Sequence, residues 1–262
     1  MKMSNLRSER LPNIWCPGCG NGIVLRSLLE SVEQLGLDTD KIVVVSGIGC
    51  SSRAPAYTNF DNVHTLHGRA IPVATGIKLA NPDLTVIVLT GDGDSSAIGG
   101  NHLIHAARRD VDITVIVFNN FNYGMTGGQA SPLTPVASVT TTTPGGNTDR
   151  PFDLVNLTAG AGATYVARTG IYFTKHMLDH LKKAIAHRGF SLVDVIAQCP
   201  TYFGRFNKKG DAGQMIVSQK DWLVLKSVAD KKSPQELAGK IVIGEFVNIP
   251  PPGPAVVPEG QV

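Results

Sequence analysis

The chain has 262 residues, 17% of them charged, and a formal net charge of +3 at pH 7 with no extended basic cluster. This length suffices for one α/β domain with appendages, the charge pattern does not indicate nucleic-acid binding, and the low charged fraction suggests a surface partly covered by other subunits. The polar first ten residues do not form a signal peptide, and no apolar run approaches the ~20 residues of a membrane span, so we expect a cytoplasmic protein without membrane contact.

The first motif along the chain is a C-x-x-C turn, WCPGCG, at residues 15–20. Apolar residues at helical spacing follow it and Gly36 provides a stop, so a helix is predicted between them. A C-x-x-C turn at a helix N-terminus can serve disulfide exchange, zinc binding or iron–sulfur ligation. Taken alone, the motif does not distinguish among these three uses.

Residues 41–45 are apolar and mostly β-branched, which predicts a buried strand, and the loop after it carries Cys50. The segment LHGRA then leads into a helix predicted over 71–80. His67 and Arg69 lie at the entrance of this helix, on the sheet edge that the Cys50 loop shares. For His67, contact with a ligand and a plain surface or capping role are both open. We take His67 and Arg69 as candidate catalytic residues.

Two more buried strands are predicted at 84–89 and 113–118, with a crossover helix at 101–109 between them. The first strand runs into GDGD at 91–94 and the second into NN at 119–120. Both loops therefore leave the carboxyl edge of a parallel sheet, where open α/β folds bind ligands. The chain is thus predicted to be an α/β protein with a mostly parallel sheet flanked by helices.

The residues of these two loops indicate a metal–diphosphate site. Gly91 and Gly93 allow close approach of the backbone, but Asp92 would repel a diphosphate unless a divalent cation lay between them. Mg2+ binds through one or two protein oxygens together with phosphate oxygens. Asn120 supplies an amide oxygen from the neighbouring strand end, and the carbonyl of Asn122 could supply another. Two ordinary turns rich in Gly and Asn are the alternative explanation.

The second half begins with an irregular loop at 130–151, and loops of this length are usually functional or mobile. It is followed by a predicted helix at 152–161, a strand at 163–168, a helix at 174–187 and a strand at 190–197. The last strand leads directly into Cys199, at the same sheet edge as Cys50. We expect one ligand-binding domain over 1–205, and an extended C-terminal arm over 206–262 that contacts a partner subunit.

Cys16, Cys19, Cys50 and Cys199 are all the cysteines of the chain. In a reducing compartment disulfides are improbable, and a spaced set of cysteines more often ligates metal. Four thiolates at one point can hold a four-iron four-sulfur cluster or a zinc ion. A zinc ion would only stabilise the fold, whereas a cluster could carry electrons. Four thiols with unrelated roles are the third possibility.

As a set, the motifs WCPGCG, GIGCSSR, HGRA, GDGD, NN with YGMTGGQ, and CPTY resemble the β subunit of 2-oxoacid:ferredoxin oxidoreductases. The resemblance extends from Trp15 to Tyr202. It implies a thiamine-diphosphate-binding fold in which Asp92, Asn120 and the Asn122 carbonyl ligate Mg2+, and in which the four cysteines hold one 4Fe-4S cluster. The cofactor-binding residues that it implies are Gly91, Asp92, Gly93, Asp94, Asn120, Asn122, Gly124 and Thr126.

The same resemblance implies a reaction, the coenzyme A-dependent oxidative decarboxylation of a 2-oxoacid, or its reverse, with electrons passing through the cluster to ferredoxin. MTGGQ at 125–129 looks more like the 2-oxoglutarate members of the family, with pyruvate and branched-chain 2-oxoacids as alternatives. Two rival functions are a non-redox thiamine-dependent decarboxylase or carboligase subunit and a zinc-stapled nucleotide-binding or electron-carrier module.

The chain has no second run of alternating strands and helices that could hold the aminopyrimidine of the cofactor. We therefore expect an α subunit to supply that half of the site, together with the catalytic glutamate. Further ferredoxin-like subunits are compatible with such an assembly.

Overall fold

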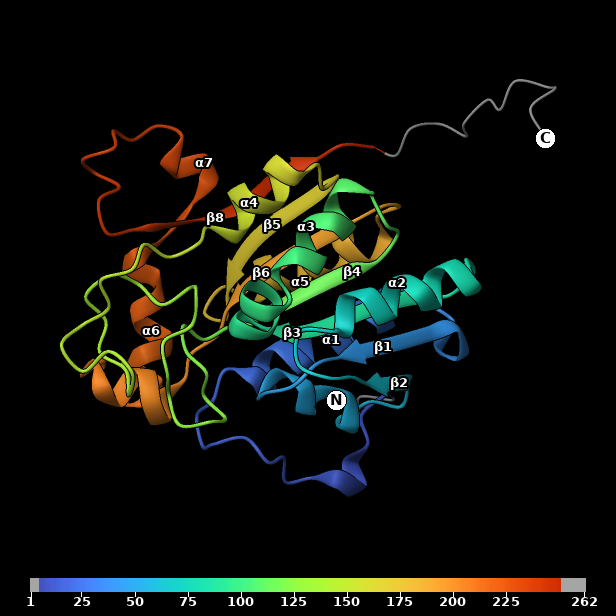
Figure 1. Ribbon diagram of the computed structural model, residues 1–262, viewed down its shortest axis with the longest axis horizontal. Helices are drawn as coiled ribbons and strands as arrows, with labels where there is room; N and C mark the ends of the chain where they lie inside the picture. Colours follow the sequence, from blue (N-terminus) through green and yellow to red (C-terminus); the bar gives the residue numbers. More distant parts are fainter. Residues whose placement is uncertain (1–4, 251–262) are drawn as a thin grey trace.

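The computed structural model describes residues 5–250, and within that range one eight-stranded sheet forms its centre (Figure 1). The strands are β1 (Ile42–Ser46), β2 (Asp61–His64), β3 (Thr85–Gly91), β4 (Thr114–Asn119), β5 (Tyr165–Gly170), β6 (Ser191–Ile196), β7 (Leu223–Leu225) and β8 (Ile241–Asn248). Their order is β2-β1-β3-β4-β6-β5-β8-β7. In this order, each neighbouring pair from β2 through to β5 is parallel, the β5–β8 pair is antiparallel and the β8–β7 pair is parallel. This arrangement confirms the predicted mostly parallel sheet.

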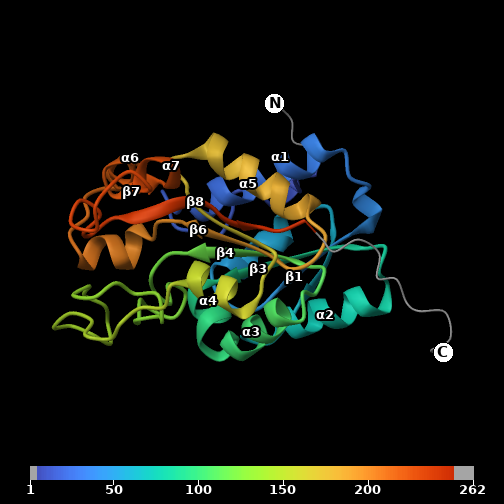
Figure 2. The same cartoon turned by 90° about the horizontal axis from the view of Figure 1, so that it is seen from above.

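Helices cover both faces of this sheet, as Figure 2 shows. One face carries α1 (Asn21–Leu35) and α5 (Thr174–Ala186), and the other carries α2 (Ala70–Ala80), α3 (Gly100–Arg108) and α4 (Leu154–Ala161). Successive residues of a strand point to opposite faces. Val43 and Val45 of β1 therefore lie in the core with α2 and α3, whereas Ile42 and Val44 lie in the core with α1. Burial on both faces explains why these strands are continuous apolar runs.

Shorter elements complete the described chain. They are three 3-10 turns (Ser8–Arg10, Thr39–Lys41 and Ser51–Tyr57), two π-helical turns (Asp94–Ile98 and Pro200–Gly204), and the helices α6 (Ala212–Trp222) and α7 (Lys226–Ala229). α6 begins with a capping box, because the Asp211 side chain accepts from the Gln214 N–H while the Gln214 side chain accepts from the Asp211 N–H. No helix of the described residues is long and apolar enough to cross a membrane.

The C-terminal part differs from the predicted extended arm. Residues 212–248 form α6, β7, α7 and β8, and β8 joins the sheet beside β5 with Ile243 fully buried in the core. Burial of β8 outweighs the polar and lysine-rich stretches around it, so this part is continuous with the first 205 residues. Contact between the C-terminal region and a partner subunit stays a prediction, and residues 251–262 lie outside the described range.

The parallel strands bring four loops to one edge of the sheet. β1 leads to Cys50, β3 to Asp92, β4 to Asn120 and β6 to Cys199, and these strands pair in register as neighbours. The predicted metal loops and two of the predicted cluster ligands therefore share the carboxyl edge, as the sequence indicates.

Candidate functional site

Asp92, the first residue after β3, is buried, with only 3% of its surface exposed. Its Oδ2 accepts a hydrogen bond of 2.5 Å from the hydroxyl of Ser131. Burial raises the pKa of Asp92 to about 7, although the Ser131 hydrogen bond opposes this by favouring the ionised carboxylate. A buried carboxylate of this kind is well suited to a cation, which would replace the proton.

The loop after β4, the strand next to β3, carries two asparagines at the same edge of the sheet. The N–H of Asn122 donates to Oδ1 of Asn120 at 3.2 Å, and Nδ2 of Asn122 donates to the Asn120 carbonyl at 2.9 Å. Oδ1 of Asn122 is buried and has no hydrogen-bond partner among the described residues. A buried acceptor without a partner costs about 1–3 kcal/mol. This oxygen therefore fits a metal ligand, and the predicted role of the Asn122 backbone carbonyl stays a prediction.

Gly124 joins the metal loop to the cysteine region. A Cβ at this position would lie 3.4 Å from Oδ1 of Asn122, 3.5 Å from Sγ of Cys50 and 3.6 Å from Nδ2 of Asn120. The absence of a side chain leaves a small space bordered by the predicted metal ligands and one predicted cluster ligand. The structure thus brings the two candidate sites next to each other.

Asp94 is also buried, but protein groups already satisfy its carboxylate. It accepts from the Gly68 N–H at 2.6 Å and from the Thr90 hydroxyl at 2.7 Å, and Nδ1 of His67 lies 2.7 Å from its Oδ1. A Cβ at Gly47 would overlap the same carboxylate. Asp94 therefore holds three loops together, and direct contact of Asp94 with a cofactor stays a prediction.

His67 lies at the edge of the site with 36% of its side chain exposed. Its ring packs edge-on against Tyr123, with the centroids 6.1 Å apart. Arg69 precedes α2 and donates to the His67 carbonyl at 3.3 Å. An imidazole beside a carboxylate and open to solvent can hold or transfer a proton, and the catalytic roles of His67 and Arg69 stay predictions.

The other predicted cofactor residues have contacts within the protein. A Cβ at Gly93 would overlap the ring of Tyr123, so the chain itself requires this glycine. A Cβ at Gly91 would lie 3.4 Å from the Ser51 hydroxyl. Thr126 is exposed, and its hydroxyl donates to Oε1 of Gln129 at 2.6 Å within the same turn. Their contacts with a cofactor stay predictions.

Two sets of hydrogen bonds draw the cysteine loops together. The Gly20 N–H donates to the Gln198 carbonyl at 3.1 Å, and Nε2 of Gln198 donates to the Gly18 carbonyl at 2.8 Å. These bonds join the C-x-x-C turn to the residue before Cys199. The indole N–H of Trp15 donates to the Cys50 carbonyl at 2.7 Å, which joins the same turn to the third cysteine.

Burial and neighbouring thiols together raise the pKa of two of the four cysteines. Burial raises the pKa of Cys19 to about 11, and the Cys199 and Cys16 thiols add to the shift. Burial raises the pKa of Cys50 to about 12, with further contributions from Cys19, Cys199 and Cys16. Buried, mutually repelling thiolates need positive charge, which iron would supply.

Across residues 5–250, no three His, Cys, Asp or Glu side chains are grouped so that they could hold one metal ion. Binding of a 4Fe-4S cluster by the four cysteines stays a prediction, with a zinc ion as its alternative.

Two residues near the site were assigned no role from the sequence. Ser131 contacts Asp92 from the 130–151 loop, whose unusual length was the only available signal. Arg53 ends the GIGCSSR motif, three residues after Cys50. Its Nε is buried without a hydrogen-bond partner among the described residues, and its Nη2 lies 3.9 Å from the sulfur of Met125. Arg53 therefore provides an incompletely satisfied cation at the edge of the site.

Comparisons with known proteins agree with this arrangement. Residues 47–195 match the family model described as the C-terminal TPP-binding domain of thiamine pyrophosphate enzymes. The 2-oxoglutarate synthase subunit KorB of Methanothermobacter thermautotrophicus is 53% identical over 94% of this chain and 86% of its own length. The 2-oxoacid:ferredoxin oxidoreductase subunit beta of Saccharolobus solfataricus is 48% identical over 72% of this chain and 63% of its own.

A solved structure gives the same result. It is that of the 2-oxoglutarate:ferredoxin oxidoreductase from Magnetococcus marinus with 2-oxoglutarate, coenzyme A and succinyl-CoA bound. The match has a TM-score of 0.84 and 36% sequence identity, and it covers 96% of this chain and 86% of the other.

Proposed function

Because the chain belongs to the family of 2-oxoacid:ferredoxin oxidoreductase β subunits, we propose that it forms the thiamine-diphosphate-binding half of an enzyme acting on 2-oxoglutarate. The reaction converts 2-oxoglutarate and coenzyme A to succinyl-CoA and CO2 and passes an electron pair, in single steps, to ferredoxin, or it runs in reverse. Relatives named for 2-oxoglutarate favour this substrate over pyruvate and branched-chain 2-oxoacids.

One observation carries the proposal. The space at Gly124 is bordered both by the asparagines of the metal loop and by the Cys50 thiol. Electron transfer from a reacting cofactor to a cluster requires such proximity, whereas a non-redox decarboxylase would have no use for a cluster thiol beside its metal site. When bound, thiamine diphosphate supplies the electron sink for decarboxylation and the 4Fe-4S cluster accepts electrons singly.

The residues of this chain hold and orient these groups. Asp92, Asn120 and Asn122 would bind Mg2+ and through it the diphosphate, because their oxygens are buried at one sheet edge and one of them has no partner. Cys16, Cys19, Cys50 and Cys199 would bind the cluster. His67, in contact with Asp94, would hold or move a proton at Nε2.

Arg53 offers a partner for a substrate carboxylate. Its guanidinium is half-buried between the Cys50 loop and Met125, and its Nε lacks a partner among the described residues. A carboxylate is the natural partner of a guanidinium in such a position. We propose that Arg53 binds a carboxylate of the 2-oxoacid.

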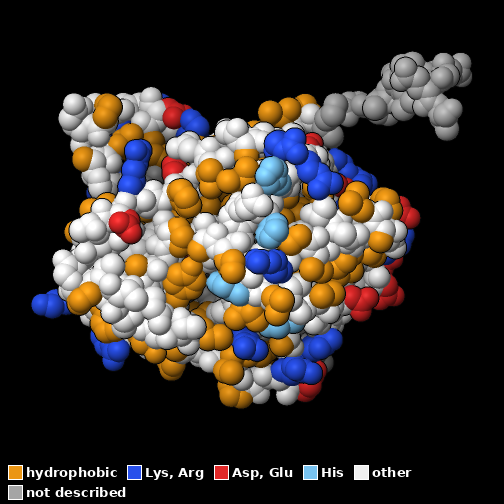
Figure 3. Space-filling model, viewed as in Figure 1, with side chains coloured by type: hydrophobic (Ala, Val, Ile, Leu, Met, Phe, Trp, Pro, Cys, Tyr) orange, Lys and Arg blue, Asp and Glu red, His pale blue; other side chains and the backbone are white. Residues whose placement is uncertain are grey.

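The site needs a second subunit. Large apolar side chains are exposed around its mouth, among them Leu66 (77%), Ile98 (52%), Met125 (41%) and Ile48 (39%). In Figure 3, hydrophobic side chains are spread over the face that carries α2 and α3, between lysine, arginine and histidine side chains. An exposed surface of this kind indicates an interface. We propose that an α subunit covers it and supplies the pyrimidine-binding half with its glutamate.

The proposal is tested on the αβ complex purified without oxygen. Ferredoxin reduction is measured with 2-oxoglutarate, pyruvate and a branched-chain 2-oxoacid, each with and without coenzyme A. We expect reduction that needs coenzyme A and is fastest with 2-oxoglutarate. A colourless complex that releases CO2 without reducing ferredoxin would support the non-redox alternative.

A further inference from the structure

A continuous chain of hydrogen bonds connects Asp92 to Arg168, on opposite sides of the metal loop. We propose that this chain positions the Mg2+-binding oxygens of Asp92, Asn120 and Asn122, and that Thr134 is its central positioning residue. The inference rests on the proposed function, since it concerns the metal that this function requires.

The first half of the chain runs through the long 130–151 loop. The Ser131 hydroxyl donates to Oδ2 of Asp92 at 2.5 Å, and the Ser131 N–H donates to Oγ1 of Thr134 at 2.8 Å. The Thr134 hydroxyl in turn donates to the carbonyl of Phe121 at 2.6 Å. Thr134 is completely buried. It therefore joins the carboxylate after β3 to the backbone of the loop after β4.

The second half runs through the sheet. The Phe121 N–H donates to Oδ1 of Asn119 at 3.3 Å, and Nδ2 of Asn119 donates to Oδ1 of Asp194 at 3.1 Å. Oδ2 of Asp194 accepts from Nε of Arg168 at 2.8 Å. Asp194 is 1% exposed in the middle of β6, where a charge is costly unless paired, so the Arg168 guanidinium balances it.

Both halves meet on Phe121, the residue between the two asparagines. Its φ is +63°, in the left-handed region that bulky side chains rarely adopt. Such a backbone persists only where its surroundings hold it. Here a side chain binds each polar group of the residue, with Asn119 on its N–H and Thr134 on its carbonyl.

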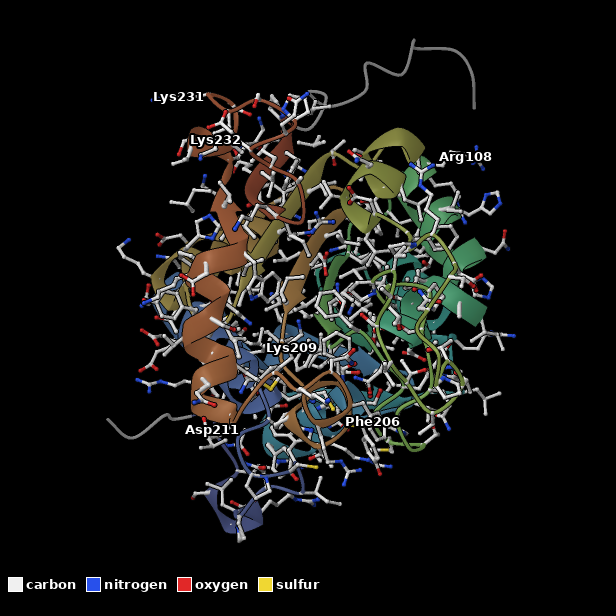
Figure 4. All side chains as sticks on the ribbon, turned by 90° about the vertical axis from the view of Figure 1, so that its left-hand side faces the viewer. Arg108, Phe206, Lys209, Asp211, Lys231 and Lys232 are labelled. Carbon is white, nitrogen blue, oxygen red and sulfur yellow. The ribbon has the colours of Figure 1, made fainter. Side chains whose placement is uncertain are left out.

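Packing alone does not fix this loop. Asn119, Phe121, Asp194 and Arg168 line a cavity of about 940 Å³ beside it. Figure 4 views this side of the molecule, with α6 and the 130–151 loop on either side of the segment that carries Lys209. Phe121 contacts Phe203 across the cavity wall, but hydrogen bonds set its backbone. A loop held in this way presents oxygens at fixed positions.

Fixed positions have a measurable consequence for the choice of metal. Mg2+ demands nearly ideal octahedral geometry with short bonds, whereas Ca2+ accepts flexible and irregular geometry. A loosened loop should therefore bind Mg2+ less well while keeping most of its affinity for Ca2+. General destabilisation of the subunit would weaken both ions alike.

The experiment uses the αβ complex and measures the concentrations of Mg2+ and of Ca2+ that give half-maximal thiamine diphosphate binding. The variants are Thr134→Val, which removes the hydroxyl but keeps the shape, and Thr134→Ser, which keeps the hydroxyl. Thr158→Val is the matched control, because Thr158 is equally buried and its hydroxyl donates to the Leu154 carbonyl within α4.

For Thr134→Val we expect the half-maximal Mg2+ concentration to rise about tenfold or more, as is typical when a partner of a metal ligand is lost. The Ca2+ requirement should rise much less, and Thr134→Ser and Thr158→Val should behave like the parent complex. Equal shifts for both ions, or no shift at all, would overturn the inference.

If the Thr134→Val complex fails to assemble, Ser131→Ala removes the hydrogen bond to Asp92 instead. The half-maximal Mg2+ concentration should again rise much more than that of Ca2+. A parent complex that binds no thiamine diphosphate with either ion would instead refute the proposed function, and the inference with it.

Discussion

Nδ1 of His67 lies 2.7 Å from Oδ1 of Asp94, a buried carboxylate whose other partners are all protein groups. The Asp94 carboxylate therefore lies in direct contact with a histidine at the mouth of the site, although Nδ1 is not aligned for a hydrogen bond to it. This contact gives His67 a defined position, which a freely rotating surface histidine would lack.

Replacing His67 tests whether it acts on protons or only fills space. His67→Asn keeps a donor for Asp94 but removes Nε2, so we expect kcat to fall about 100-fold with little change in thiamine diphosphate affinity. His105→Asn on the exposed side of α3 is the control and should be neutral. An unchanged kcat in His67→Asn would rule out a proton-transfer role.

Gly124→Ala fills the space between the two candidate sites. The added Cβ would make ordinary contacts of 3.4–3.6 Å, so the subunit should fold normally. We expect weaker thiamine diphosphate binding, which calorimetric titration of the complex measures. Gly100→Ala has no atom within 4 Å of its Cβ and provides the control. Equal affinity in both variants would show that the cofactor does not approach Gly124.

The raised pKa of Asp92 predicts a pH-dependent cofactor affinity. With the pKa at about 7, Mg2+ must displace a proton at lower pH, so affinity should fall up to about tenfold per pH unit below that value. Ser131→Ala removes a bond that favours the carboxylate, so its midpoint should lie at higher pH, which separates this titration from that of the phosphate. Binding that does not vary with pH would contradict the assignment.

The raised pKa of Asp92 has the opposite effect on the stability of the metal-free complex, which should decrease as the pH rises. The folded pKa of Asp92 is raised from 3.8 to about 7, so its contribution to the free energy of unfolding is complete below about pH 4. That contribution is lost as the pH rises towards 7. Asp92→Asn should therefore make the metal-free complex less sensitive to pH in this window, as thermal unfolding at a series of pH values would measure.

Trp15→Phe should destabilise the cluster and leave the metal site intact. The change keeps the packing against Tyr57, where the ring centroids are 5.3 Å apart, but removes the donor to the Cys50 carbonyl. We expect the visible absorbance of the complex to decay faster in air, with unchanged thiamine diphosphate affinity. Trp222→Phe, the other tryptophan, should keep the parent decay rate. Equal decay in both variants would mean that this hydrogen bond does not support the cluster.

Much of the candidate site could be predicted because it depends on local pattern. The strands predicted at 84–89 and 113–118 are found at Thr85–Gly91 and Thr114–Asn119, and their exit loops carry Asp92 and Asn120. A short β-branched run followed by polar residues predicts both the strand and the edge of the sheet at which the strand ends. The exposed edge strand β2 was missed because its sequence, DNVH, has no apolar alternation.

The hydrogen-bond chain behind the metal loop could not be predicted in this way. Ser131 and Asp92 are 39 residues apart, and Asn119 and Asp194 are 75 apart. Their contact depends on β6 lying next to β4, which follows from the order of the strands rather than from any motif. The pairing of β8 depends likewise on the sheet edge that β5 leaves open. The lysine-rich sequence around β8 gives no indication of this pairing.

Substrate oxidation at the Asp92 site should deliver electrons to a cluster held by the four cysteines. The visible absorbance of the anaerobic, thiamine diphosphate-loaded αβ complex after addition of 2-oxoglutarate and coenzyme A tests this directly. We expect bleaching of the cluster in the parent complex, and none in Asp92→Ala although its iron and sulfide content, about four of each per β chain, is unchanged. Bleaching that persists in Asp92→Ala, or a parent complex without iron, would contradict this expectation.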